Sequence, residues 1–211
     1  MMDRYQIQIP ENFFAGFEAL SQELNKAAKQ LTESLQQVGR LLPPSLHLLS
    51  THGWYVSDTS TITEGIILAA EAAKGNAEKV DNTLQKFYQK QCSSIILRLK
   101  KRFPERANIL DEALKAHKRK MFYSSTCLFL STADGLLDGT LFKTKGDKAN
   151  LKKHLNKVTY LKSLENAITT VSAIDIPHSK KSKFPSSLNR HSVLHGLDFE
   201  YGTQLNSLKA Q

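Results

Sequence analysis

The segment MFYSSTCLFLSTADGLL, which runs from Met121 to Leu137, is the most apolar stretch of this chain. We expect it to be the central helix of the core, with Asp134 and Gly135 near its end, because an apolar run of this length is typical of a buried helix. The alternation of apolar and polar residues that indicates strands persists nowhere for more than a few residues. The rest of the chain is therefore expected to pack around this segment as helices.

Helical periodicity is found on both sides of this segment. Apolar residues at three- and four-residue spacings predict helices at residues 62–74, 77–102 and 106–118, and the same periodicity returns at residues 151–171. Thr63 is the expected cap of the first of these helices. The fold class predicted from this pattern is all-α, an antiparallel helical bundle of about six or seven helices without internal repeats.

A long amphipathic helix is predicted at residues 11–39, before the bundle. Gly39 and the Pro43–Pro44 pair are expected to end it, since proline removes a helical hydrogen bond. We expect one domain over residues 1–211, with residues 1–42 as a semi-independent N-terminal appendage. The apolar positions of this helix are Phe13, Phe14, Phe17, Leu20, Leu24, Ala27, Ala28, Leu31, Leu35 and Val38.

Charge is distributed unevenly along the 211 residues, whose formal net charge is +9. Residues 1–97 hold 8 Lys and Arg against 10 Asp and Glu, whereas residues 98–211 hold 21 against 10. A basic half of this kind attracts polyanions such as nucleic acid, and a lysine-rich solvated surface is the alternative interpretation. The two cysteines, the lack of an apolar region in the first ten residues and the lack of any apolar run of about 18 residues predict a soluble cytoplasmic protein.

The densest group of reactive side chains follows a basic loop expected at residues 172–188, whose final serine pair, Ser186–Ser187, is suited to cap a helix. Asn189, Arg190, His191 and His195 come directly after this loop. An amide, a guanidinium and two imidazoles on a short packed helix can bind a phosphate and move a proton near neutral pH. These four residues are the candidate catalytic residues.

The spacing of Arg190 and His195, with a polar residue after the arginine, resembles the R-x(4–6)-H signature of the HEPN superfamily. Many members of this all-α superfamily are metal-independent ribonucleases that act as toxins, phage-defence effectors or RNA-processing enzymes. The surrounding pattern also resembles a group of uncharacterised bacterial proteins. It consists of Asn189-Arg190-His191, His195-Gly196, Tyr201-Gly202-Thr203 and Asn206.

The resemblance implies a homodimer in which two motif helices face each other across an RNA-binding cleft. Arg190 would clamp the scissile phosphate, His195 would act as general acid or base, and Asn189 and His191 would orient the reacting groups. No metal or other cofactor is implied. Residues five apart on a helix point about 140° away from each other, so the second copy is needed to bring the two functions to one phosphate.

The sequence also departs from the family in two respects and offers a second match. One departure is its end at Gln211, barely two turns past Thr203, where the resembling domains usually continue as a longer core helix. Some HEPN toxins carry a tyrosine two residues after the histidine, where a partner antitoxin modifies it, but this chain has Leu197 there. Arg40 and His47 also fit the signature, and we set them aside because Pro43 and Pro44 are expected to prevent a common helix.

Two other interpretations of the same residues remain open. His191 and His195 lie four apart, a spacing that can bind zinc, and Asp198 or Glu200 could supply a third ligand. Alternatively, the chain is a non-catalytic helical interaction or regulatory module, in which the arginine and the histidines only pair with carboxylates and carbonyls.

Overall fold

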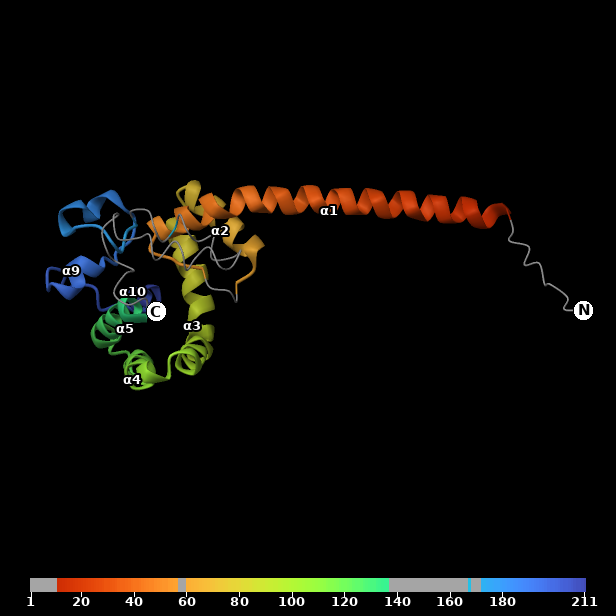
Figure 1. Cartoon of the computed structure of the whole chain (residues 1–211). Coiled ribbons are helices and arrows are strands. Elements are labelled where there is room, and N and C mark those ends of the chain that lie inside the picture. The colour runs from red at the N-terminus through yellow and green to blue at the C-terminus, as the bar shows by residue number, and fades with distance from the viewer. Residues whose placement is uncertain (1–10, 57–59, 137–166, 168–171) are drawn as a thin grey trace, which may run out of the picture. The chain divides into compact units, whose positions relative to one another are not determined.

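The structure, a computed structural model, describes residues 11–56, 60–136, 167 and 172–211. Within these residues all regular structure is helical, so the chain is an all-α helical bundle as predicted (Figure 1). The chain divides into two compact units, Met1–Arg40 and Leu41–Gln211. The boundary lies two residues before the end of the N-terminal segment expected from the sequence.

The first helix, α1 (Glu11–Thr51), passes through Gly39, Pro43 and Pro44. The prediction that it ends at these residues is therefore wrong. A proline inside a helix costs about 3 kcal/mol, because a hydrogen bond is lost and the ring meets the preceding turn. Three leucines around the prolines offset this cost, because each contributes about 1.5–3 kcal/mol when fully buried. They are Leu42, Leu46 and Leu49, whose exposures are 6%, 2% and 0%.

The continuity of α1 has a consequence for the second motif match. Arg40 and His47 lie on one helix, so the reason for setting this pair aside is wrong. The two residues belong to different units of the chain, and we base no site on them.

The next two helices form from strong local signals. α2 (Ile62–Ala73) begins with a capping box in which Thr61 and Glu64 each bond the other's backbone N–H, so the cap is Thr61 and not Thr63. Gly75 follows with a φ of 84°, a left-handed conformation that glycine adopts without strain. α3 then spans Ala77–Arg102, which agrees with the predicted range at both ends.

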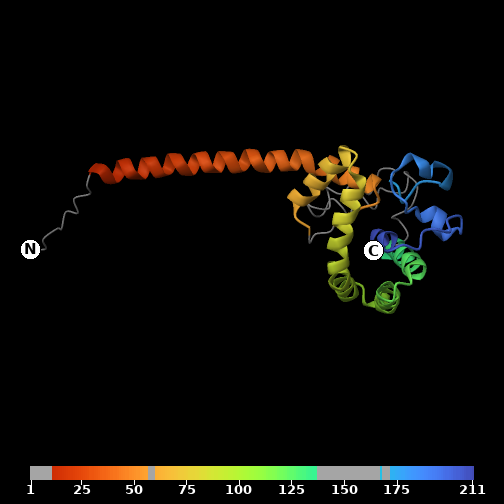
Figure 2. The same ribbon diagram turned by 180° about the vertical axis from the view of Figure 1, so that it is seen from behind.

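The helix predicted at residues 121–137 is found as α5 (Phe122–Leu136), which packs against α4 (Ala107–Lys118) and α10 (Gln204–Ala210). Its expected place as the central core helix is wrong, because it supplies buried residues to only one of the two core clusters. Figures 1 and 2 show the C-terminal helix α10 lying beside α5 from both sides. A short 3-10 helix, η1 (Pro104–Arg106), joins α3 to α4. The helix expected at residues 151–171 falls almost wholly outside the described residues. Of the helices that are described, none is long and apolar enough to cross a bilayer.

Two apolar clusters form the core of the second unit, and α3 contributes to both. The first includes Leu46, Leu49, Trp54, Val80, Leu84, Tyr88 and Leu208. The second includes Ile96, Leu110, Ala113, Leu130, Leu188 and Val193. Because Leu188 directly precedes the motif residues and Val193 lies among them, the second cluster holds the candidate site in place.

A buried polar network fixes α10 against α3. The Trp54 Nε1–H donates to Asp81 Oδ1 at 2.7 Å, and Lys209 Nζ lies 3.0 Å from the same oxygen. The Lys209 ammonium also lies 5.2 Å from the centre of the Trp54 ring, and its side chain is only 2% exposed. Burial lowers the pKa of Lys209, while the nearby Asp81 carboxylate acts in the opposite direction. These groups satisfy one another, so the C-terminal helix is an integral part of the core.

Candidate functional site

Asn189 lies in the protein interior, where its side chain stabilises the start of α9 (Arg190–Leu194). Its Oδ1 accepts from the Ser192 N–H at 2.8 Å and from the Ser192 hydroxyl at 2.7 Å. Its Nδ2 donates to the carbonyls of Ala173 at 3.0 Å and Ile176 at 2.9 Å. The residue is 0% exposed, so its amide is fully used by the fold.

The cap of α9 is therefore Asn189, and the expectation that Ser186 and Ser187 cap the motif helix is wrong. Asn189 has the extended backbone that a cap needs, with φ −133° and ψ 117°. The Ser187 hydroxyl instead donates to Asn206 Oδ1 at 2.7 Å, and Ser186 Oγ accepts from the Leu188 N–H at 3.2 Å. Ser186 and Ser187 lie three and two residues before the cap position, Asn189, and connect the loop to its surroundings instead.

Arg190 is the first residue of α9, and its side chain points toward α5. Its Nη2 lies 3.4 Å from Asp134 Oδ2, and the two side chains are 27% and 24% exposed. Its backbone N–H donates to the Ile174 carbonyl at 3.0 Å. The Nη2–Oδ2 contact is longer than the 2.7–2.9 Å or so of a strong charge-assisted bond.

His191 and His195 lie together on the surface, at the end of α9. Their ring centres are 4.4 Å apart, and both residues are exposed. His195 is the C-cap residue of the helix, and Gly196, with a φ of 68°, follows it. The structure thus brings the two histidines together, while Arg190 contacts Asp134.

The expected basic loop, residues 172–188, contains a 3-10 helix, η3 (His178–Lys183), and is anchored by the buried residues Ile174, Ile176 and Leu188. His178 Nδ1 lies 2.7 Å from the Ser192 hydroxyl. Because that hydroxyl donates to Asn189 Oδ1, it must accept from His178, so the Nδ1 of His178 carries the proton. η3 is thus attached to α9 through a fixed chain of hydrogen bonds.

Asp198, a possible third metal ligand, is already paired. Its Oδ2 lies 2.5 Å from Lys181 Nζ, and its Oδ1 accepts from the Glu200 N–H at 3.0 Å. Burial acts to raise the pKa of Asp198, but these hydrogen bonds outweigh it and lower the pKa below its ordinary value. Across the part of the chain that the structure describes, no three His, Cys, Asp or Glu side chains are grouped to hold a metal ion.

The second half of the motif pattern supports the fold. Thr203 caps α10 by accepting from the Asn206 N–H at 3.1 Å, and Asn206 Nδ2 donates to the Tyr201 carbonyl at 3.2 Å. The Tyr201 hydroxyl lies 3.2 Å from Cys127 Sγ, and this contact together with burial raises the pKa of Tyr201 to about 12. Tyr201 therefore stays protonated at neutral pH and is unsuited to be a general base.

The sequence analysis missed a group of exposed apolar residues, two of which follow His195 closely in the chain. Phe199 is 79% exposed, Leu197 is 48% exposed and Tyr123 is 53% exposed. The Tyr123 hydroxyl donates to the Phe199 carbonyl at 3.0 Å, so the two aromatic residues lie near each other. Exposure is decided by packing, and no pattern in the sequence distinguishes Phe199 from a buried phenylalanine.

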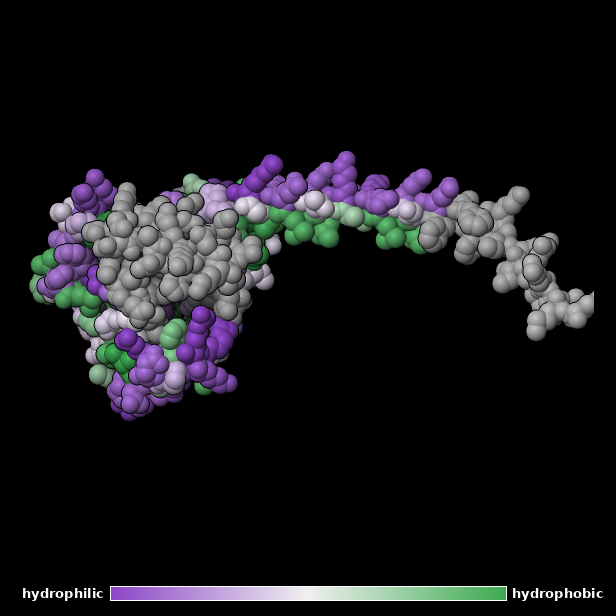
Figure 3. Space-filling view, viewed as in Figure 1, coloured by the Kyte–Doolittle hydropathy of each residue, from purple (hydrophilic) through white to green (hydrophobic). Residues whose placement is uncertain are grey.

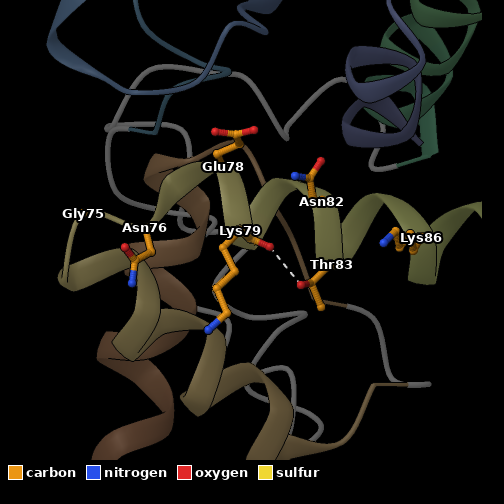
Figure 4. Close-up of a pocket in the computed structure, with 7 residues that line it drawn as sticks. All are labelled: Gly75, Asn76, Glu78, Lys79, Asn82, Thr83 and Lys86. Carbon is orange, nitrogen blue, oxygen red and sulfur yellow. Dashed lines mark hydrogen bonds between the residues drawn. The ribbon is translucent and has the colours of Figure 1, made fainter.

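A separate hollow of about 620 Å³ lies along the start of α3 (Figure 4). It is lined by Gly75, Asn76, Glu78, Lys79, Asn82, Thr83 and Lys86. The Lys79 ammonium is bonded to Glu71 at 2.9 Å, and the Thr83 hydroxyl donates to the Lys79 carbonyl at 2.8 Å. None of the motif residues lines this hollow, so it is not part of the candidate site.

Comparisons with protein-family models, curated proteins and solved structures found no match to this chain. The function must therefore be inferred from the chemistry of the site.

Proposed function

We propose that this chain is a metal-independent endoribonuclease of the HEPN type, of the toxin or phage-defence kind, which acts in the cytoplasm as a homodimer. The observation that carries the proposal is the exposed pair of imidazoles, His191 and His195, at the end of a helix that begins with Arg190. Imidazole is the side chain best suited to accept and donate protons near neutral pH.

In the proposed reaction, the 2′-hydroxyl of the RNA attacks the adjacent phosphorus. His195 removes the proton from this hydroxyl as the new P–O2′ bond forms. The bond between phosphorus and the 5′-oxygen breaks, and a protonated imidazole donates its proton to the 5′-oxygen. The products are a 2′,3′-cyclic phosphate and a 5′-hydroxyl. In this proposal His191, whose ring lies beside that of His195, orients the reacting groups.

Arg190 provides the phosphate clamp in this proposal. A guanidinium can hold two phosphate oxygens at once in a planar fork, which is the arrangement this role needs. Because Arg190 and His195 lie about 140° apart around the helix, the arginine of one copy acts with the histidine of the other. Asn189 takes part only indirectly, by fixing the start of α9.

The surroundings of the histidines fit single-stranded RNA. Lys180 and Lys183 on η3 are exposed and can attract the phosphates. Phe199 and Tyr123, which are more than half exposed, can stack on bases, as aromatic side chains do in proteins that bind single strands.

A non-catalytic interaction module is the second candidate, and the Arg190–Asp134 pair favours it. In that case the arginine is a structural residue, and the exposed Leu194, Leu197 and Phe199 form a contact surface for a protein partner.

The two candidate functions predict different results in an RNA cleavage assay performed in excess EDTA. We expect the wild-type protein to cleave single-stranded RNA to 2′,3′-cyclic phosphates, and His195→Ala to bind RNA equally well without cleaving it. The control is His47→Ala, which removes a histidine from α1. If the wild type leaves a pool of random RNA intact, or if EDTA abolishes cleavage, the proposal is wrong.

A further inference from the structure

An apolar stripe runs along one face of the N-terminal part of α1. Figure 3 shows hydrophobic residues along this face and hydrophilic residues along the opposite face. The four leucines of the stripe, Leu20, Leu24, Leu31 and Leu35, are between 57% and 62% exposed. Four large side chains exposed in a row on one helix need a partner surface.

The sizes of the six central side chains of this stripe, from Leu20 to Leu35, are symmetric about a midpoint between Ala27 and Ala28. Moving away from that point in either direction, the stripe has an alanine, then a leucine after three or four residues, then another leucine. The matched pairs are Ala27 with Ala28, Leu24 with Leu31, and Leu20 with Leu35. This arrangement is self-complementary under a two-fold axis, because each position then meets its counterpart on an identical chain.

We propose that α1 pairs with α1 of a second copy of this chain in an antiparallel arrangement, centred on Ala27 and Ala28. In this register Leu24 packs against Leu31 of the partner subunit, and Leu20 packs against Leu35 of the partner subunit. The small alanines at the centre let the two helices approach closely, since the distance between packed helices depends on the side chains at their contact.

The charges of α1 favour a second copy over a lipid surface. Residues 18–40 contain three acidic residues, Glu18, Glu23 and Glu33, and three basic residues, Lys26, Lys29 and Arg40. Helices that bind anionic membranes carry a polar face rich in lysine and arginine, whereas this segment is neutral overall. The proposed register sets Lys26 level with Lys29 of the partner subunit, but both lysines are exposed and keep their ammonium groups in water. The apolar stripe can therefore determine the pairing.

The area of the stripe is sufficient for a dimer. Full burial removes about 100 Å² of apolar surface per leucine, and with the two alanines and the neighbouring methylenes each helix buries about 600 Å². A pair then buries roughly 1,200 Å², which is the lower limit for stable protein interfaces. Pairing also explains how so long a helix with exposed leucines is stable, because most helical stability in proteins comes from packing.

The first test is the mass of the full-length chain by sedimentation equilibrium. We expect twice 23.7 kDa for the wild type, and the single mass for the double variant Leu24→Glu/Leu31→Glu, whose charges face each other in the paired helices. The control, Gln22→Glu/Gln36→Glu, adds the same charges to the polar face of α1 and should remain a dimer.

The direction of pairing is tested by oxidative crosslinking of introduced cysteines. The wild-type protein, which contains Cys92 and Cys127, gives the amount of crosslinking that comes from the native cysteines. Leu20→Cys/Leu35→Cys should crosslink efficiently. Leu20→Cys alone should not, because in the antiparallel register the two copies of residue 20 lie about 22 Å apart.

Three results would overturn this proposal. They are a monomeric wild type, crosslinking of Leu20→Cys/Leu35→Cys that persists when Leu24→Glu and Leu31→Glu are added, and efficient crosslinking of Leu20→Cys alone. A wild type that remains monomeric but binds lipid vesicles would assign the stripe to a membrane surface. None of these measurements involves RNA, so the pairing of α1 is tested independently of the proposed ribonuclease activity.

Discussion

At the scale of single residues, the polar side chains of the motif divide into two groups. Asn189 and Asn206 are buried, at 0% and 1% exposure, and are occupied by hydrogen bonds within the chain. His191 and His195 are exposed. Part of the group of polar residues that suggested a reactive site in the sequence therefore serves to hold the fold together.

We expect Asn189→Ala to destabilise the fold strongly. The change removes the cap of α9 and leaves two buried carbonyls unpaired, which together cost about 3 kcal/mol or more. Urea denaturation of Asn189→Ala and of Asn25→Ala, an exposed asparagine on α1, gives the comparison. Equal stability of the two variants would mean that the interior hydrogen bonds of Asn189 contribute little.

Arg190→Ala and Arg190→Lys should both abolish RNA cleavage. Lysine keeps the charge but cannot offer the planar fork that holds two phosphate oxygens. Single-turnover cleavage rates measure the loss, and RNA affinity should change little because many cations contribute to binding. Full activity of Arg190→Lys would show that only charge is needed at this position.

At the scale of elements, the site depends on close contact between α5 and the segment before α10. A Cβ at Gly202 would overlap the Tyr123 ring, so a side chain there must displace the tyrosine. Tyr123 also packs edge-on against Tyr201, with ring centres 5.0 Å apart. The glycine of the Tyr201-Gly202-Thr203 pattern is thus required by packing.

We expect Gly202→Ala to destabilise the protein by about 1–3 kcal/mol, as overpacking does. Tyr123→Ala should relieve most of that penalty, because the ring that blocks the new methyl group is then absent. Denaturation of the two single variants and of the double variant gives the coupling energy. Additive effects would show that the loop relaxes without moving Tyr123.

At the scale of the whole molecule, two buried histidines link stability to pH. Burial lowers the pKa of His117, which contacts the Ser207 hydroxyl at 2.8 Å. Burial also lowers the pKa of His52, where Asp81 opposes the effect and Lys209 adds to it. The folded state thus holds both rings neutral, whereas the unfolded chain binds protons at an ordinary histidine pKa.

Stability should therefore fall as the pH decreases below about 6.5, since the unfolded state then binds more protons than the folded state. The free energy of unfolding measured by urea at several pH values between about 7.5 and 5 checks this. The paired Asp198 carboxylate loses its contribution to stability only at lower pH, because its pKa is below the ordinary value. A stability that is flat over this range would contradict the prediction.

The net charge of +9 leads us to predict that RNA binding by this chain depends strongly on salt. RNA binding should weaken about tenfold or more between roughly 50 and 200 mM salt, because bound counterions are released on binding. Fluorescence anisotropy with a labelled single strand measures the affinity. An affinity that does not depend on salt would exclude binding through the basic half.

Local signals in the sequence were enough to predict most helices of the described chain. The range of α3 agrees at both ends, and α5 was expected within one residue at each end. These helices follow from apolar periodicity and from residues that stop a helix locally. The all-α class could be predicted for the same reason, but the helix that contributes to both core clusters is α3 and not α5.

Tertiary structure decided what local signals could not. Whether α1 continues through Pro43 and Pro44 depends on the burial of Leu42, Leu46 and Leu49, which balances the local cost of the prolines. At the candidate site, the sequence located Asn189, Arg190, His191 and His195, but only packing turned the first inward, paired the second with Asp134 and left the histidines exposed. Side chains at neighbouring positions differ in environment because burial depends on residues distant in the chain, and the sequence does not record those contacts.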